Sequence, residues 1–166
     1  MNTYHHKQPF TLECGTVLPE LTIAYHTFGK LNADKSNVVW VCHHLTANSN
    51  ALEWWPGMIG NGCVISPEKH FIVCANILGS CYGTTGPLSV NPKTNEPYYN
   101  DFPFPTVRDI VNAHILLRKH LGLEKIHVMI GGSMGGYQAL EWCIKEKEVT
   151  DNLILLATSP AESAWG

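Results

Sequence analysis

The sequence predicts an α/β fold, in which a mostly parallel sheet carries helices on both faces. Two observations lead to this prediction. In the second half of the chain, strand-like apolar runs alternate with segments of helical periodicity, and this order implies parallel strands joined by right-handed crossovers. The runs are also apolar almost throughout, which suits strands covered on both sides of a sheet.

Length and composition favour one domain. The chain has 166 residues, of which 45% are hydrophobic and 15% charged, so it can bury a core. It contains no repeat, no low-complexity stretch and no internal linker. We therefore expect residues 1–166 to belong to a single domain.

The elements follow in order along the chain. Apolar runs predict strands at 21–29, 38–42 and 70–76, and a region rich in glycine and proline, 77–105, predicts loops. Thr106 with Asp109 three residues later resembles a capping box, and Gly122 ends the helix that follows. Further strands are expected at 126–130 and 152–158, with a helix between them. The apolar face of the helix after Thr106 comprises Val107, Ile110, Val111, His114, Leu117 and Leu121, and His114 is expected to be a core histidine with its hydrogen bonds satisfied.

The stretch "GGSMGG", 131–136, lies on the turn between the strand at 126–130 and the next helix. Its frame Gly131-x-Ser133-x-Gly135 fits the nucleophile elbow, where side chains two residues either side of the serine would collide with neighbouring backbone. The helix start supplies free N–H groups and a positive dipole end. The alternative is a glycine-rich turn without catalysis, such as a phosphate cradle, but both phosphate-loop patterns are absent. The elbow predicts an α/β-hydrolase fold.

Composition excludes several other functions. The net charge is −3 with acids and bases mixed, so no basic patch for nucleic acid or a membrane surface is expected. No apolar run could span a bilayer, and the N-terminus lacks a signal peptide, which predicts a cytoplasmic protein. Six cysteines without a CxxC pair favour a reduced protein. Nine histidines without an HExxH pattern predict no metal site.

Several longer stretches resemble one family. "CHHLTANSN" (42–50), "EWWPGMIGNG" (53–62), "NILGSCYGTTGPLSVNP" (76–92), "DFPFPTVRDIV" (101–111) and "GGSMGGYQALEW" (131–142) are similar to the homoserine O-acetyltransferases of the α/β-hydrolase superfamily. The resemblance begins at about residue 10, and one departure is Ala47, where the family commonly has glycine.

This resemblance implies an acetyl transfer from acetyl-CoA to the hydroxyl of L-homoserine, in methionine biosynthesis, by a ping-pong mechanism. Ser133 would be the nucleophile, and the backbone N–H groups of Leu45 and Met134 would form the oxyanion hole. Acetyl-CoA would be a co-substrate, and no bound cofactor is expected. We expect the complete protein to be a homodimer.

The sequence lacks part of the expected catalytic set. In this architecture the acid and the histidine follow the serine, yet no histidine follows Ser133. His43 and His44 are the nearest candidates for a base, although shaping the oxyanion loop is their expected role. We therefore expect an N-terminal portion of a longer enzyme, with a sheet incomplete at its C-terminal side and the lid and later triad segment absent.

Alternative functions remain open at this point. The same scaffold could use succinyl-CoA as donor or serine as acceptor. The elbow alone also permits a serine hydrolase, an esterase or peptidase, because both reactions pass through an acyl-enzyme. A third possibility is that this polypeptide alone is an inactive fragment or an assembly partner.

Overall fold

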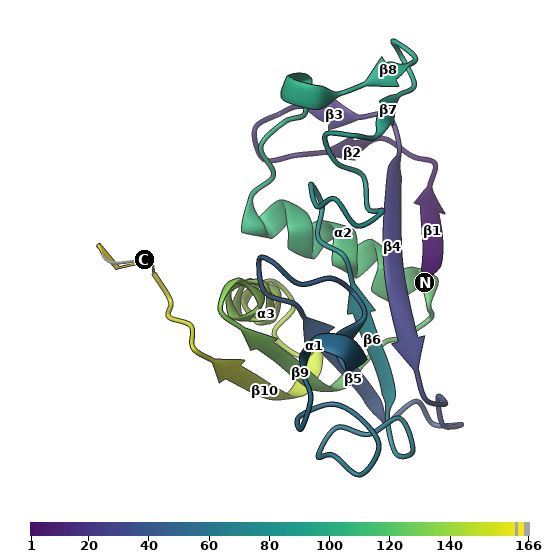
Figure 1. Ribbon diagram of the computed structural model, residues 1–166, viewed down its shortest axis with the longest axis vertical. Helices are drawn as coiled ribbons and strands as arrows, with labels where there is room; N and C mark the ends of the chain where they lie inside the picture. Colours follow the sequence, from purple (N-terminus) through teal and green to yellow (C-terminus); the bar gives the residue numbers. More distant parts are fainter. Residues whose placement is uncertain (162, 165–166) are drawn as a thin grey trace.

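The computed structural model describes residues 1–161 and 163–164 (Figure 1). From residue 107 onward its helices and strands alternate as expected. The elements are β1 Asn2–His6, β2 Phe10–Thr11, β3 Val17–Leu18, β4 Leu21–Phe28, β5 Val38–Cys42, α1 Ala51–Trp54, β6 Phe71–Ala75, β7 Val90–Asn91, β8 Glu96–Pro97, the 3-10 helix η1 Tyr99–Asp101, α2 Val107–His120, β9 Ile126–Gly132, α3 Met134–Lys145 and β10 Thr150–Leu156.

The central sheet has six strands within the described residues, in the order β1-β4-β6-β5-β9-β10. Strands β6, β5, β9 and β10 are parallel, whereas β4 is antiparallel to β6 and β1 is antiparallel to β4. The predicted α/β fold with a mostly parallel sheet is thus confirmed. Antiparallel pairing is confined to the edge at which the chain enters the sheet.

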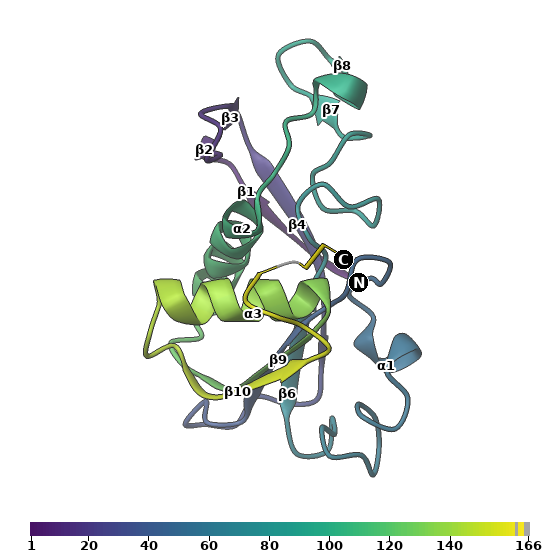
Figure 2. The same ribbon diagram turned by 90° about the vertical axis from the view of Figure 1, so that its left-hand side faces the viewer.

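The crossovers explain why the sheet is covered on both faces. The chain moves from β5 to β6 in one direction, and from β6 through α2 to β9 and through α3 to β10 in the other. Right-handed crossovers in opposite directions must lie on opposite faces. Figure 2 accordingly shows α2 and α3 on one face and α1 on the other. The point where the direction changes lies between β5 and β9, and ligands of open α/β sheets bind at such points.

The buried strand β5 shows how the core divides. Its residues Trp40 and Cys42 pack on the side of α2 and α3, whereas Val39 and Val41 pack with the segment around α1. Trp40 and Trp142 of α3 are both fully buried, and their rings meet edge to face at 5.0 Å. Such an aromatic pair contributes about 0.5–1.5 kcal/mol beyond its buried area. The two-residue period was hidden in the sequence because both faces are apolar.

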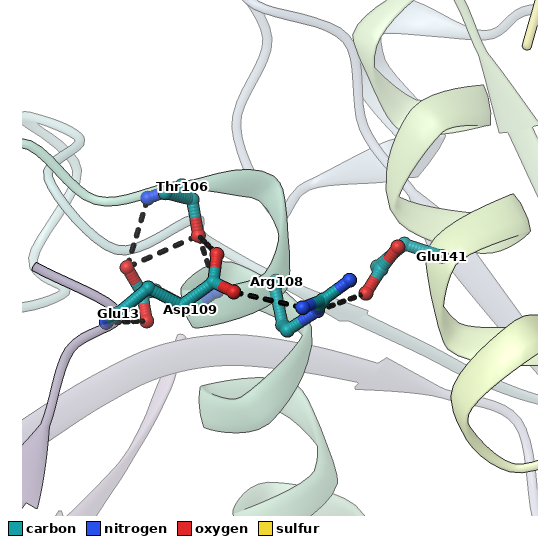
Figure 3. Close-up of polar contacts among 5 residues, drawn as sticks. All are labelled: Glu13, Thr106, Arg108, Asp109 and Glu141. Atoms are coloured by element: carbon teal, nitrogen blue, oxygen red, sulfur yellow. Dashed lines mark hydrogen bonds and ion pairs between the residues drawn. The ribbon is translucent and has the colours of Figure 1, made fainter.

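The capping box of α2 belongs to a wider polar cluster (Figure 3). The Thr106 hydroxyl accepts from the Asp109 N–H at 3.2 Å, and the Asp109 carboxylate accepts from the Thr106 N–H at 2.9 Å. Asp109 also accepts from the Glu13 N–H at 2.9 Å. Arg108 bonds Glu13 at 2.9 Å and Glu141 of α3 at 2.6 Å. The cluster therefore confirms the expected cap and ties the start of α2 to the β2–β3 turn and to α3.

One expectation about α2 was wrong in part. His114 lies in the core, 1% exposed, with its ring centroid 6.1 Å from that of Trp40 and 6.2 Å from that of Trp142. Its hydrogen bonds are not satisfied, because neither ring nitrogen finds a partner within the described residues. Burial, with a smaller contribution from nearby His43 and against a small opposing effect of the Asn76 backbone, lowers the pKa of His114 to about 3, so its ring is neutral at physiological pH.

Some elements were not predicted. Strand β1 carries the polar sequence "NTYHH" and, among residues 1–161 and 163–164, joins the sheet only through its pairing with β4. The pairs β2–β3 and β7–β8 are two-residue ladders. The strand expected at 126–130 continues to Gly132, and the last strand begins at Thr150 rather than at 152.

Candidate active site

Ser133 lies between the end of β9 and the first residue of α3, with φ 52° and ψ −124°. Few non-glycine residues adopt this backbone conformation, and it is costly unless neighbours hold it. Here the Ser133 N–H donates to Leu156 O of β10 at 3.0 Å, and the Gly136 N–H donates to Ser133 O at 2.9 Å. The side chain is exposed at the end of the parallel strands.

The glycines two residues before and after Ser133 are required by close backbone approach. A Cβ on Gly131 would lie 2.2 Å from Gly135 O, and a Cβ on Gly135 would lie 2.0 Å from Cys42 O at the end of β5. Gly136 is also tight, since a Cβ there would meet the Thr158 side chain at 2.4 Å. Only with glycine at 135 can the start of α3 reach β5 this closely.

Leu45 and Met134 are brought together although they are far apart in the sequence. Both line a groove of about 590 Å³, with apolar residues of the 77–105 region. Within the described residues, neither backbone N–H donates to a backbone carbonyl. Met134 is the first residue of α3, where a free N–H and the positive end of the helix dipole are expected. The two N–H groups are therefore free to bind a developing negative charge.

A second hollow opens directly beside Ser133. It measures about 310 Å³ and involves side chains that come after β5, β9 and β10. The rings of His44 and Trp54 meet edge to face at 5.0 Å, and those of Trp54 and Trp55 stack at 5.1 Å. The lining residues are His44, Trp54, Trp55, Gly132, Ser133, Leu156 and Ala157.

No base contacts the Ser133 hydroxyl in the part of the chain that the structure describes. His44 lines the same hollow, but its Nδ1 pairs with the Thr46 hydroxyl at 3.3 Å. Both ring nitrogens of His43 are engaged elsewhere, with His44 O and the Ile77 N–H. Neither histidine therefore forms a hydrogen bond with Ser133 within the described residues, although His44 lines the same hollow.

Several site residues lie in stretches that resemble the family, but no pattern in the sequence assigned them to the site. Trp54 ends α1 and Trp55 follows it, and both line the hollow beside Ser133, whereas Gln138 reaches the end of β5 from inside α3. No spacing rule links these residues to Ser133. Among residues 1–161 and 163–164 there is no group of three or more His, Cys, Asp and Glu side chains able to hold a metal ion. All six cysteines are free.

The sheet and the strand–helix turn at Ser133 agree with the family whose model matches this chain. The model of a family described as alpha/beta hydrolase fold matches residues 37–165. The chain belongs to the α/β hydrolase fold family.

Within this family, the chain is most readily compared with curated homoserine O-acetyltransferases. The chain is 49% identical over 162 residues to the homoserine O-acetyltransferase of Cyclobacterium marinum, covering 98% of the chain and 46% of that protein. It is 52% identical over 157 residues to the homoserine O-acetyltransferase of Chlorobaculum parvum, covering 95% of the chain and 44% of that protein. The expected resemblance is confirmed. The chain spans about half the length of the curated relatives it matches.

Solved structures of this α/β hydrolase fold show the same architecture. A homoserine O-acetyltransferase from Bacillus anthracis aligns with a TM-score of 0.90 and 31% identity, covering 98% of the chain and 48% of that structure. Esterase E22 aligns with a TM-score of 0.87 and 29% identity, covering 99% of the chain and 49% of that structure. Transferases and esterases are therefore both close to this chain in structure. No helix in residues 1–161 has the length and apolar character needed to cross a membrane.

Proposed function

We propose that the full-length protein containing this chain transfers an acetyl group from acetyl-CoA to the hydroxyl of L-homoserine, in methionine biosynthesis. The observation that carries this proposal is the strained Ser133, exposed at the end of β9 near two backbone N–H groups without backbone partners. The names of curated relatives at 45–52% identity supply the substrate class. The alternative donor, succinyl-CoA, and the alternative acceptor, serine, are each tested by substitution for acetyl-CoA or L-homoserine in the assay below.

The proposed reaction has two halves. Ser133 Oγ attacks the thioester carbonyl, its proton passes to a base, and CoA leaves as the thiol, so that Ser133 carries the acetyl group. The homoserine hydroxyl then attacks this ester, and O-acetyl-L-homoserine leaves as Ser133 recovers its proton. In both halves the N–H groups of Leu45 and Met134 bind the oxyanion of the tetrahedral intermediate. Removal of one such donor typically lowers kcat by about 10²–10³-fold.

We propose that residues 1–166 form the N-terminal part of one catalytic domain, and that the acid and the histidine come from residues outside this chain. Three facts support this proposal. No histidine follows Ser133 in the given sequence, and both ring nitrogens of His43 form hydrogen bonds with other groups. The curated relatives are also about twice as long as the segment that matches this chain. The free cysteines suit a reducing, cytoplasmic setting. The full-length protein is expected to be a homodimer and to need no bound cofactor.

A serine hydrolase is the second candidate, and the similarity to esterase E22 favours it. Both activities share the acyl-enzyme, so they differ only in whether water or a bound alcohol reaches the ester. The hollow lined by His44, Trp54 and Trp55 opens beside Ser133, and we propose that the acceptor approaches through it. The two functions therefore differ in whether water or homoserine accepts the acetyl group from Ser133.

The test compares CoA release by the full-length protein with and without L-homoserine, and identifies the acylated products. We expect release to accelerate with homoserine, O-acetyl-L-homoserine to form, and an acetyl adduct to map to Ser133 by mass spectrometry when the acceptor is omitted. Equal rates with free acetate as the product would assign a hydrolase. Activity that survives Ser133→Ala would remove Ser133 as the nucleophile.

A further inference from the structure

The loop that follows β5 is anchored through the ring of His43. This side chain is 1% exposed. Its Nδ1 lies 2.8 Å from the carbonyl oxygen of His44, and the backbone N–H of Ile77, after β6, donates to its Nε2 over 3.3 Å. One ring therefore joins the loops that leave two neighbouring parallel strands.

The two partners determine where the proton of His43 resides. A carbonyl oxygen can only accept, so Nδ1 carries the hydrogen, and a backbone N–H can only donate, so Nε2 carries the lone pair. Burial lowers the pKa of His43, against a smaller opposing effect of the His44 carbonyl, and keeps the ring neutral at neutral pH. Such a ring holds the loop and has no free nitrogen with which to deprotonate Ser133.

The bond to His44 O acts directly on Leu45. The carbonyl of His44 and the N–H of Leu45 belong to one planar trans peptide unit, so they point in opposite directions. The same oxygen also accepts from the Ala47 N–H at 3.1 Å. Because this oxygen is held from two sides, the peptide plane is fixed, and the Leu45 N–H points away from the His43 ring.

Gln138 connects this loop to the start of α3. Its side chain is fully buried, and its Nε2 donates to His43 O at 3.1 Å and to Met134 O at 3.4 Å. The close approach that glycine permits at position 135 brings α3 within reach of the loop. A single amide therefore contacts both the loop that carries the Leu45 N–H and the first turn of the helix that begins with the Met134 N–H.

We infer that His43 and Gln138 are positioning residues that together set the direction and the separation of the two oxyanion-binding N–H groups. His43 acts as its neutral Nδ1–H tautomer and orients the His44–Leu45 peptide. Gln138 holds that peptide segment at a constant distance from Met134. The inference rests on the proposed function in one respect, namely that the Leu45 and Met134 N–H groups bind the oxyanion.

The tautomer can be observed without any assay of activity. In the full-length protein labelled with ¹⁵N-histidine, we expect Nδ1 to be the protonated nitrogen of His43 at neutral pH, with the signal assigned by its loss in His43→Asn. An Nε2–H tautomer would overturn the inference, because the ring could not then bond both His44 O and the Ile77 N–H.

Two substitutions of His43 distinguish positioning from packing. His43→Phe keeps the volume of the ring and loses both bonds, whereas His43→Asn leaves a void but places an amide N–H near the former Nδ1–H. The readout is the acylation rate of Ser133 by p-nitrophenyl acetate. We expect a decrease of about 10–100-fold for His43→Phe and a smaller one for His43→Asn. A packing role predicts the reverse order, which would refute the inference.

Matched variants complete the test. His114→Phe replaces another buried histidine, on α2, which lies near His43 and the Asn76 backbone but whose ring nitrogens have no hydrogen-bond partner within the described residues. It should leave the acylation rate within about twofold of the unmodified protein, because no N–H group is reoriented. Gln138→Met keeps the length of the side chain, removes the donor and should slow acylation by about tenfold. An unchanged rate in a folded Gln138→Met variant would refute the role of Gln138.

The same measurements separate this inference from the proposed function. The activated ester p-nitrophenyl acetate is an acetyl donor for Ser133 that requires neither acetyl-CoA nor homoserine. If acylation proceeds but homoserine never accepts the acetyl group, the transferase assignment fails, and the acylation rates of His43→Phe and His43→Asn still decide the positioning inference. If homoserine is acetylated but His43→Phe acylates faster than His43→Asn, the inference fails alone.

Discussion

At the scale of single residues, the candidate site depends on close contacts and buried rings. Ser133 is held in its strained conformation by backbone bonds to Leu156 and Gly136, and Gly135 allows α3 to touch β5. His114 is buried without hydrogen bonds from its ring nitrogens within the described residues. Single substitutions at Gly135 and His114 measure how much these contacts contribute to the free energy of unfolding.

Gly135→Val should reduce stability and activity together, because its Cβ would overlap Cys42 O at 2.0 Å. We expect a loss of about 1–3 kcal/mol or more in the free energy of unfolding, the usual cost of overpacking. Urea denaturation of the full-length protein measures it. Gly132→Ala is the matched control for stability, since no atom lies nearer than 3.7 Å to a Cβ there. Equal stability of the two variants would show that the contact at Gly135 is not limiting.

The neutral ring of His114 should make stability depend on pH. Its pKa is about 3 in the folded protein and 6.5 when exposed, so below pH 6.5 the unfolded chain binds a proton that the folded chain does not. The contribution of His114 is therefore full above pH 6.5 and falls by up to about 1.4 kcal/mol per pH unit toward pH 3. His114→Phe should remove this part of the slope between pH 7 and pH 5 in urea denaturation. An identical slope in the variant would contradict the prediction.

At the scale of elements, the start of α2 is stabilised by more than its own propensity. The capping box satisfies two backbone N–H groups, and Arg108 links this helix to the β2–β3 turn and to α3. The residues before α2 include Phe104 and Pro105, which line the groove shared by Leu45 and Met134. Because Phe104 and Pro105 directly precede the cap, the hydrogen bonds of the cap help to hold these groove residues in place.

Thr106→Ala should lower the free energy of unfolding by about 0.5–2 kcal/mol, the usual cost of losing a helix cap. The hydroxyl that accepts from the Asp109 N–H disappears, and so does its bond to Glu13. Thr106→Ser keeps the hydroxyl and serves as control, and chemical denaturation followed by circular dichroism measures both. A variant Thr106→Ser as unstable as Thr106→Ala would attribute the loss to the methyl group instead.

At the scale of the whole molecule, the sheet has two unlike edges. One edge is the polar β1, and the other is β10, which pairs only with β9 within the described residues. Leu153, Ile154 and Leu155 of β10 are 36%, 39% and 37% exposed. An apolar strand with unpaired backbone groups is a template for association.

Residues 1–166 expressed alone should be catalytically silent and should self-associate through β10. Silence follows because no histidine forms a hydrogen bond with Ser133 within the described residues, and loss of a triad member costs several orders of magnitude where this has been measured. Light scattering and an acetyl-transfer assay test both parts. Ile154→Lys, which puts a charge on the exposed edge, should reduce association. A monodisperse chain with near-enzymatic turnover would overturn both parts and would make His44 the candidate base for Ser133.

The sequence alone determined the α/β class, the main strands, both ends of α2 and the place of Ser133 on a strand–helix turn, because periodicity, caps and glycine spacing are local signals. It did not determine β1, since polar "NTYHH" becomes a strand only by pairing with β4. Nor could it place Trp54, Trp55 or Gln138 beside the site. Only the tertiary structure brought the loops after β5 and β6 to the start of α3, because contacts between distant segments depend on crossover direction and close packing, which no local spacing encodes.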